Sequence, residues 1–378
     1  MRVLHLCAGN MYGGIERLLV TLARERAACA QMQPEFAACF EGRLTEELRA
    51  TGVPVHILGP VRFSRPWMVS RARRALRMLL QQEHFDVAVT HACWPHMLFG
   101  PTVVAANQTL VLWSHDLLTG KTWIERLARR TTPSRIVVAS EFSGSTVRRL
   151  FPTVDVSIIH CPVSKSQVTD PSRARAKVRR EFLTDENCRV IALASRLELC
   201  KGHKLLLAAL SQLKTRNTRW ECWIAGGAQR PKENAYLKEL QSLAAGYRIS
   251  PRVKWLGQRS DVDRVLAAAD IYCQPNSEPE AFGIALVEAM HAGLPIVTTE
   301  LGPAREIVSE ACGAVVPPEP AAVADALRRM IEDSALAAQL GAAGPRRAIE
   351  LCDPGGCLSR LATTLAQKHV QASPANAA

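Results

Sequence analysis

Residues 271–290 read IYCQPNSEPEAFGIALVEAM. The short apolar run at 271–273 predicts a strand, the polar segment after it predicts a loop, and a helix is expected to begin near Phe282. This order of elements is the repeating unit of parallel sheets, which bind ligands at the carboxyl ends of their strands. The stretch therefore predicts an α/β domain with a binding site at that edge.

The same alternation of short Val-, Ile- and Ala-rich runs with helical segments occurs along the chain in two series. A length of 378 residues suits two domains, and 48% hydrophobic with 22% charged residues excludes a disordered, collagen-like or coiled-coil protein. We therefore predict the α/β class with two Rossmann-like, doubly wound domains. The expected strands are 3–7, 36–40, 55–58, 87–90, 110–113, 136–139 and 156–159, then 189–194, 221–225, 253–256, 271–273, 296–298 and 314–316.

Changes in composition place the boundaries between these domains. We expect an N-terminal domain over 1–165, a linker with a connecting helix over 166–187, and a C-terminal domain over 188–350. Residues 351–370 are expected to form a helix that crosses back to the N-terminal domain, and 371–378 a disordered tail.

Cysteine usage and hydropathy predict a cytoplasmic protein. The twelve cysteines are scattered without a CxxC pair, which favours buried thiols in a reducing compartment over disulfides or zinc. Residues 87–115 lack Asp, Glu, Lys and Arg, but their prolines, histidines and amides interrupt any apolar run long enough to span a membrane. The first ten residues suit a buried strand better than a signal peptide.

Two carboxylates mark the strongest chemical signal. Glu280 and Glu288 are eight residues apart, about 12 Å along a helix at ~1.5 Å per residue, which is too far for one shared metal or proton. The helix start between them offers backbone N–H groups to a phosphate, and Gly283 allows a close approach. An elongated ligand with a central diphosphate, such as a nucleotide-sugar, fits this spacing.

Two cations follow the strand at 189–194, in the segment SRLELCKG. Arg196 can bind phosphate oxygens in pairs, and Lys201 supplies a compact charge. Together they would neutralise a departing diphosphate without a metal. The alternative is a pair of solvated surface cations.

These residues resemble glycosyltransferase family 4, the retaining transferases of the GT-B fold. Glu280 and Glu288 match the E-x7-E motif of that family, and Arg196 with Lys201-Gly202 matches its cations after the first strand of the C-terminal domain. The likeness extends over roughly 188–315. It includes Trp255-Leu256-Gly257, Ala269-Asp270, Pro275, Phe282-Gly283, Glu288-Ala289-Met290 and Gly293-Leu294-Pro295.

The resemblance implies a cleft between two domains, an acceptor on the first, a nucleotide-diphosphate sugar on the second, retention of anomeric configuration, and neither a metal nor another cofactor. It places Glu280 at the transferred sugar and Glu288 on the donor ribose. The positions expected at the diphosphate are Arg196, Lys201 and the backbone near Phe282 and Gly283.

The first domain carries weaker signals. Gly13 and Gly14 could cradle a phosphate or the acceptor, although turns need glycine anyway. The family has a similar glycine-rich turn, often followed by a Glu that Glu16 matches. It also commonly places a functional His where His115 follows a strand, which implies a catalytic contact to the sugar or acceptor. The alternative is a structural histidine.

Two other patterns resemble metal sites. Asp261-Val262-Asp263 spells DxD but precedes a helical run, so we interpret it as a helix N-cap. His91, Cys93 and His96 follow no familiar zinc spacing and are interpreted as a loop after the strand at 87–90.

The net charge of +12 lies in the first half of the chain. Residues 1–180 hold 25 Lys and Arg against 13 Asp and Glu, whereas 181–378 hold 22 of each. The segment from Arg62 to Arg77 has six Arg, no acid and an interleaved Trp67. It predicts an exposed helix with its apolar stripe on the core, a contact to an anionic membrane, or a site for an anionic acceptor. No nucleic-acid partner is expected.

The sequence therefore predicts a retaining glycosyltransferase with a carbohydrate or lipid-linked acceptor, acting in cell-surface polysaccharide, lipopolysaccharide or glycolipid synthesis. Its expected location is cytoplasmic, peripheral on the inner face of the membrane. The rivals are a nucleotide-sugar epimerase of the same fold and a non-catalytic binding protein. A dehydrogenase is disfavoured because no GxGxxG follows the first strand. One departure from the family is His160-Cys161-Pro162, where relatives often carry Asn-Gly.

Overall fold

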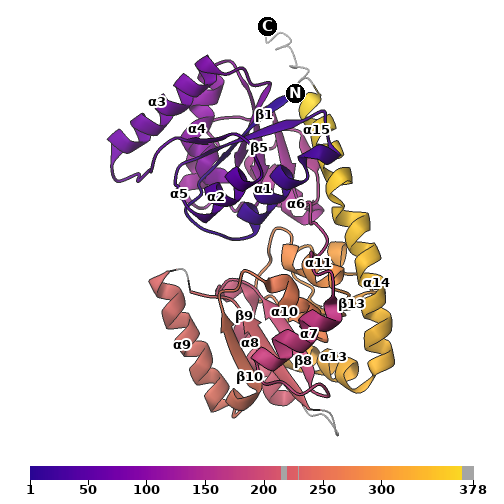
Figure 1. Ribbon diagram of the computed structural model, residues 1–378. Helices are drawn as coiled ribbons and strands as arrows, with labels where there is room; N and C mark the ends of the chain where they lie inside the picture. Colours follow the sequence, from indigo (N-terminus) through magenta and orange to yellow (C-terminus); the bar gives the residue numbers. More distant parts are fainter. Residues whose placement is uncertain (214–218, 229, 368–378) are drawn as a thin grey trace. The chain divides into compact units, whose positions relative to one another are not determined.

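The computed structural model describes residues 1–213, 219–228 and 230–367 (Figure 1). The chain divides into two compact units. The first comprises Met1–Pro162 and the C-terminal segment that begins at Pro354, and the second is Val163–Asp353. The tail expected at 371–378 lies outside the described residues.

The first unit is a seven-stranded parallel sheet with the strand order β3-β2-β1-β4-β5-β6-β7. Its strands are β1 Arg2–Cys7, β2 Gln33–Ala38, β3 Val55–Ile57, β4 Val87–His91, β5 Thr109–Ser114, β6 Arg135–Val138 and β7 Val156–Ile158. Its helices are α1 Gly14–Arg24, η1 Arg26–Ala28, α2 Arg43–Ala50, α3 Pro66–Gln82, α4 Cys93–Ala105, α5 Trp123–Ala128, α6 Glu141–Leu150 and α15 Pro354–Ala366. Helix α15 packs on α1 and η1, so this last described helix belongs to the first unit.

The second unit is a six-stranded parallel sheet with the strand order β10-β9-β8-β11-β12-β13. Its strands are β8 Arg189–Ala194, β9 Trp220–Ala225, β10 Val253–Gly257, β11 Ile271–Gln274, β12 Ile296–Thr299 and β13 Gly313–Val316. Its helices are α7 Pro171–Glu181, η2 Leu199–Lys201, α8 His203–Gln212, α9 Pro231–Gly246, η3 Ser250–Arg252, α10 Val262–Ala268, α11 Ile284–His291, α12 Ala304–Ile307, α13 Pro320–Glu332 and α14 Ser334–Cys352.

Both sheets confirm the predicted α/β fold, and each of the thirteen predicted strands is present within a few residues of its expected bounds. Strands such as β8, with the sequence RVIALA, are buried almost throughout, because helices cover both faces of a parallel sheet. In each sheet the strand order reverses at one place, between β1 and β4 and between β8 and β11. Open α/β sheets bind ligands at such switch points.

Helix α7 belongs to the second unit and does more than connect the domains. Arg179 in this helix is 1% exposed, and its guanidinium donates to Asp270 Oδ2 at 2.7 Å and to the carbonyl oxygens of Ala268, Asp185 and Cys188. A buried charge is stable only when it is paired and hydrogen-bonded. These bonds fix α7 beside α10, which it contacts along its length.

In the described part of the chain, no helix is both long and apolar enough to cross a bilayer. All twelve cysteines are free thiols, and all but Cys200 are buried.

Candidate functional site

The switch point of the second sheet gathers the acid and one of the cations singled out in the sequence. The loop after β8 carries Arg196 and Lys201, and the loop after β11 carries Glu280. The Nζ atom of Lys201 lies 2.5 Å from Oε2 of Glu280. Both side chains are only partly accessible, at 18% and 15%. The structure therefore brings together two of the predicted catalytic residues.

Two amide side chains hold the other carboxylate oxygen of Glu280. Its Oε1 accepts hydrogen bonds from Nε2 of Gln274 at 3.0 Å and from Nδ2 of Asn276 at 2.5 Å. Gln274 also donates to Oδ1 of Asn276 and accepts from the hydroxyl of Tyr272. A carboxylate that receives this many donors is held in one orientation.

The backbone of this loop is fixed from the neighbouring strand. The hydroxyl of Thr298 donates to the carbonyl oxygen of Gln274 at 2.8 Å, and that of Thr299 donates to the carbonyl oxygen of Asn276 at 2.6 Å. Gln274 and Asn276 are themselves buried. Sequence reasoning missed both amides, although the polar residues that follow the strand at 271–273 were a signal that could have found them.

A close approach at Gly202 joins the two loops. A Cβ atom there would lie 1.7 Å from the carbonyl oxygen of Pro275, and its φ of +70° is left-handed, so only glycine fits. Ser277 completes the junction through hydrogen bonds to the carbonyl oxygens of Cys200 and Leu199. Gly202 therefore seats Lys201 beside the second loop.

Arg196 lies in the same loop with a different partner. Its Nη1 is 2.8 Å from Oε1 of Glu198, and the arginine side chain is 36% exposed. Arg196 and Lys201, the cations predicted to bind the diphosphate, are thus each paired with a carboxylate of the protein in this structure. An anionic ligand would have to compete with these partners.

The expected helical spacing of Glu280 and Glu288 is wrong. Helix α11 begins at Ile284, with Gly283 as its N-cap at a left-handed φ of +118°, so Glu280 stands in the loop and Glu288 alone is helical. The amides of Gln274 and Asn276 hold Glu280 in that loop. Burial raises the pKa of Tyr272, and the charges of Glu288 and Glu280 raise it further. Both acids therefore act on one buried tyrosine.

A glycine pair after β9 forms a third loop at this edge. A Cβ on Gly226 would lie 2.0 Å from the carbonyl oxygen of Ser195, and one on Gly227 would lie 2.6 Å from Cβ of Gln258. These contacts draw the loop against the segment that carries Arg196. Sequence reasoning also missed this pair, although two glycines directly after a strand are a recognisable signal.

The glycine turn of the first unit is built as a helix start. Gly13 precedes α1, and its backbone N–H donates to Oε2 of Glu16 at 2.8 Å. An acidic side chain in the first turn stabilises a helix in this way. Gly14 opens the helix and is exposed. The structure thus gives Glu16 a capping bond, and the ligand roles of these three residues stay predictions.

His115 follows β5, the strand beside β4 in the first sheet, and lies next to two further histidines. Its Nε2 lies 2.9 Å from Nδ1 of His91, and Nε2 of His91 lies 2.9 Å from Nδ1 of His5. Burial lowers the pKa of His115 and of His5 to about 3 and holds that of His91 well below its usual range. Sequence reasoning singled out His115 but not His5.

The two patterns that resemble metal sites have other structures. Asp261 takes the N-cap position of α10, but its carboxylate accepts from Arg259 and not from the helix, which corrects the expected capping bond. The expected loop at 91–96 is also wrong, because His91 ends β4 and Cys93 begins α4. His96 bonds Thr90 and the carbonyl oxygen of Thr131. Among the described residues, no group of three His, Cys, Asp or Glu is placed to hold a metal ion.

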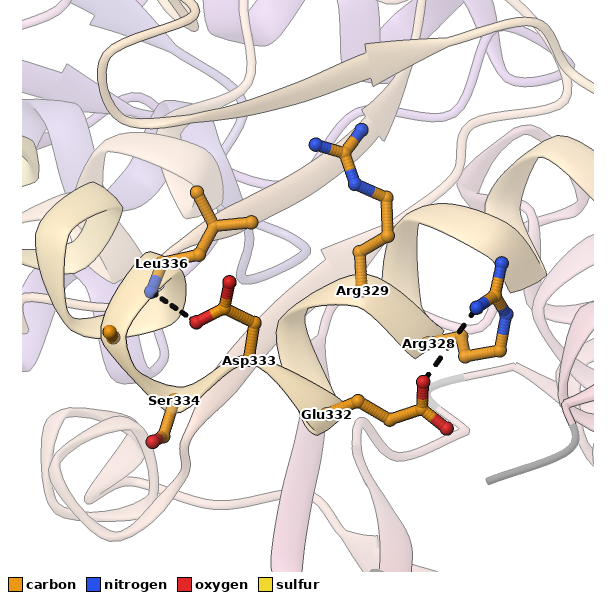
Figure 2. A pocket seen from close by; sticks show the side chains of 7 residues that line it. Arg328, Arg329, Glu332, Asp333, Ser334 and Leu336 are labelled. Carbon is orange, nitrogen blue, oxygen red and sulfur yellow. Dashed lines mark hydrogen bonds and ion pairs between the residues drawn. The ribbon is translucent and has the colours of Figure 1, made fainter. Parts of the chain in front are cut away.

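A hollow of about 540 Å³ lies away from these loops, where α13 meets α14. Figure 2 shows Asp333 turned back onto the backbone N–H of Leu336 and Arg328 paired with Glu332. The two acids that line the hollow are therefore already paired within it. None of the predicted site residues lines it.

Two domains of this topology define the GT-B glycosyltransferase class, and solved structures support the assignment. The crystal structure of Anabaena HepE in complex with UDP-glucose superimposes with a TM-score of 0.84 at 22% identity, covering 97% of this chain and 99% of that one. The lipopolysaccharide glycosyltransferase WaaG gives a TM-score of 0.73 at 16% identity. At such identities the likeness establishes the fold.

Sequence comparison gives the family. Residues 12–167 match the family described as Glycosyltransferase Family 4, and residues 174–347 match Glycosyl transferases group 1. The chain belongs to the family 4 glycosyltransferases. It is 39% identical over 111 residues to the phosphatidyl-myo-inositol mannosyltransferase of Mycobacterium leprae and 32% identical over 182 residues to the D-inositol 3-phosphate glycosyltransferase of Corynebacterium jeikeium. These matches span 29% and 43% of those relatives.

Proposed function

We propose that the protein is a retaining glycosyltransferase that moves a sugar from a nucleoside-diphosphate donor to an acceptor hydroxyl. The observation that carries the proposal is the junction of Lys201 and Glu280 at the β8/β11 switch point. The cation suits the diphosphate side of the bond that breaks in a nucleotide-sugar, and the oriented carboxylate suits the sugar side. Lys201 would stabilise the departing diphosphate, and Glu280 would hold the sugar.

The remaining donor contacts follow from the same edge of the sheet. Arg196 would exchange Glu198 for a phosphate oxygen. The backbone at Phe282 and Gly283 would also reach the phosphates, and a Cβ on Gly283 would lie 3.4 Å from Oε1 of Glu280. Glu288 would bind the ribose. The names of the relatives support this donor class, because the HepE structures contain UDP and glucose. With two cations at the diphosphate, we expect turnover to persist in a chelator.

A thermal-shift panel of nucleoside diphosphates and their sugar conjugates tests the donor site. A ligand at 100 times its dissociation constant should stabilise the protein by about 2.7 kcal/mol. We expect a shift for one base, lost in Arg196→Ala and kept in Lys204→Ala, whose lysine pairs with Glu239 on the surface. No shift for any nucleotide would contradict the proposal. Consumption of the sugar donor without an acceptor would favour the epimerase.

The acceptor is proposed to be a carbohydrate or a lipid-linked sugar held by the first unit. The relatives named above act on inositol phospholipid or inositol phosphate according to their names, which supports a glycolipid or cell-surface glycan. In this unit His115, Gly13 and Gly14 lie at or after the carboxyl ends of strands. His115 would contact the transferred sugar or the acceptor.

We propose that the basic helix α3 serves two of the predicted roles, packing on the core and contacting an anionic membrane. Its apolar stripe packs on the core of the first unit, and Trp67 is 66% exposed. Arg73 is anchored, donating to the carbonyl oxygens of Met97 and Leu98 in α4. Pro101 has no N–H for the Met97 carbonyl, so Arg73 replaces the missing donor. The outward arginines are Arg62, Arg65, Arg71, Arg74 and Arg77.

We expect these outward arginines to bind anionic membranes. Each Lys or Arg near such a surface contributes about 1 kcal/mol, so replacing Arg65, Arg71 and Arg74 by Gln should weaken binding roughly a hundredfold at low salt. Binding is measured by flotation of the protein with anionic vesicles that contain phosphatidylglycerol and, for comparison, with pure phosphatidylcholine vesicles. The matched control replaces three exposed cations of the second unit, Lys204, Arg305 and Arg346. Equal losses for both triples would contradict a site on α3.

A further inference from the structure

Three imidazole rings form a row across the first sheet. His5 lies in β1, His91 ends β4 and His115 follows β5, and these strands are neighbours in the sheet. His5 pairs in register with Val89, and His91 pairs with Trp113. Side chains two residues apart in a strand share a face. The row therefore runs diagonally from the buried interior to the carboxyl edge.

The two hydrogen bonds of the row must point the same way. Both nitrogen–nitrogen distances are 2.9 Å, and each bond needs one proton. A neutral imidazole has one N–H and one lone pair, so His91 donates to one neighbour and accepts from the other. Burial keeps all three rings neutral at pH 7 by lowering their pKa values. The position of a single proton thus sets the tautomer of every ring.

The inner end of the row decides the direction. His5 is fully buried and stacked on Phe36, and its Nε2 has no hydrogen-bonding partner in the described part of the chain. One direction would leave a buried N–H there without an acceptor, and the other leaves only a bare lone pair. Orphaned buried N–H groups are the rarer of the two. His5 is therefore expected to donate from Nδ1 to His91, and His91 from Nδ1 to His115.

We propose that His5 and His91 are positioning residues that hold His115 as the Nδ1–H tautomer. His115 would then meet the substrate as a neutral hydrogen-bond donor, suited to a hydroxyl or phosphate oxygen, and not as a general base. The inference rests on the proposed function, since it needs His115 at the substrate. It assigns a role to His5 and His91 that the strand sequences alone do not indicate.

Nitrogen-15 NMR of histidine-labelled protein tests the tautomer without any activity. Long-range proton–nitrogen correlations at pH 7.5 should show a protonated Nδ1 and a bare Nε2 for His115, and the same for His5. In His91→Phe, which keeps a ring but breaks both bonds, His115 should become a mixture of tautomers. A protonated Nε2 on His115 in the wild-type protein would overturn the proposal.

Turnover separates a positioning role from a structural one. His91→Phe should lower kcat about tenfold to a hundredfold, the usual cost of losing an orienting partner. The double variant His91→Phe/His115→Ala should have the same kcat as His115→Ala alone, because both substitutions remove the same interaction of His115. The control is His96→Phe, another buried histidine, which bonds Thr90 and Thr131 outside the row and should lower stability but not turnover in folded protein.

The outcomes distinguish the inference from the function on which it rests. If His115→Ala keeps full turnover, the proposed role of His115 is wrong, and the NMR result still decides the tautomer. If His115→Ala loses turnover and folded His91→Phe does not, His115 acts without help from His5 and His91. In that case the positioning role is overturned while the transferase function stands.

Discussion

Lys201→Met should lower transferase turnover by roughly a hundredfold to a thousandfold, the range seen when one preorganised charge is removed from a developing anion. The reason is the position of Nζ, which lies 2.5 Å from the carboxylate of Glu280 and beside the loop joined at Gly202. The measurement is steady-state turnover with the donor that the thermal-shift panel identifies. A folded variant that keeps a third of its turnover would contradict the role.

Two further variants separate the effect on the diphosphate from the effect on Glu280. Lys204→Met breaks a lysine–glutamate pair of the same length, but that pair is exposed, so it should cost at most about 1 kcal/mol of stability and no turnover. In a Glu280→Gln background, Lys201→Met should still reduce turnover if Lys201 acts on the diphosphate. If the second loss vanishes, Lys201 serves only to hold Glu280.

The first unit should lose most of its stability between pH 7.5 and pH 5. Burial lowers the pKa values of four histidines of this unit, to about 3 for His5 and His115, to about 4 for His96, and well below the usual range for His91. Because the folded pKa lies below the unfolded value of about 6.5, the unfolded chain takes up the protons first and stability falls as pH drops. At pH 5 this costs about 2 kcal/mol per histidine, roughly 8 kcal/mol in all.

Hydrogen exchange at the two pH values, corrected for the intrinsic rate, measures this loss unit by unit. A loss of about 8 kcal/mol is comparable to the whole stability of a typical domain, about 5–15 kcal/mol. Protection of β4 and β5 should therefore fall well before that of β8 and β11, since His203 is the fully buried histidine of the second unit. His5→Phe should remove about a quarter of the pH dependence. Equal loss of protection in both units would contradict the assignment to these histidines.

Local composition was enough to predict the strands, because a strand buried on both faces must be short, apolar and rich in β-branched residues. Thus β8 appears at its predicted bounds, and β11 differs by the single residue Gln274. The same local rules failed in the loop after β11, where helical spacing was assumed for Glu280. Three donors, one each from Gln274, Asn276 and Lys201, hold the Glu280 carboxylate in that loop, and two hydroxyl bonds from β12 fix the loop backbone.

Residue patterns along the chain were sufficient to predict the class of fold, the family resemblance and the charged residues that carry it. Which of those residues meet depends on how the strands are arranged in space. Lys201 and Glu280 are 79 positions apart and touch because β8 and β11 are neighbours. The row of His5, His91 and His115 likewise exists because β1, β4 and β5 are adjacent. Strand order is set by the packing of the whole sheet, which no local pattern of residues encodes.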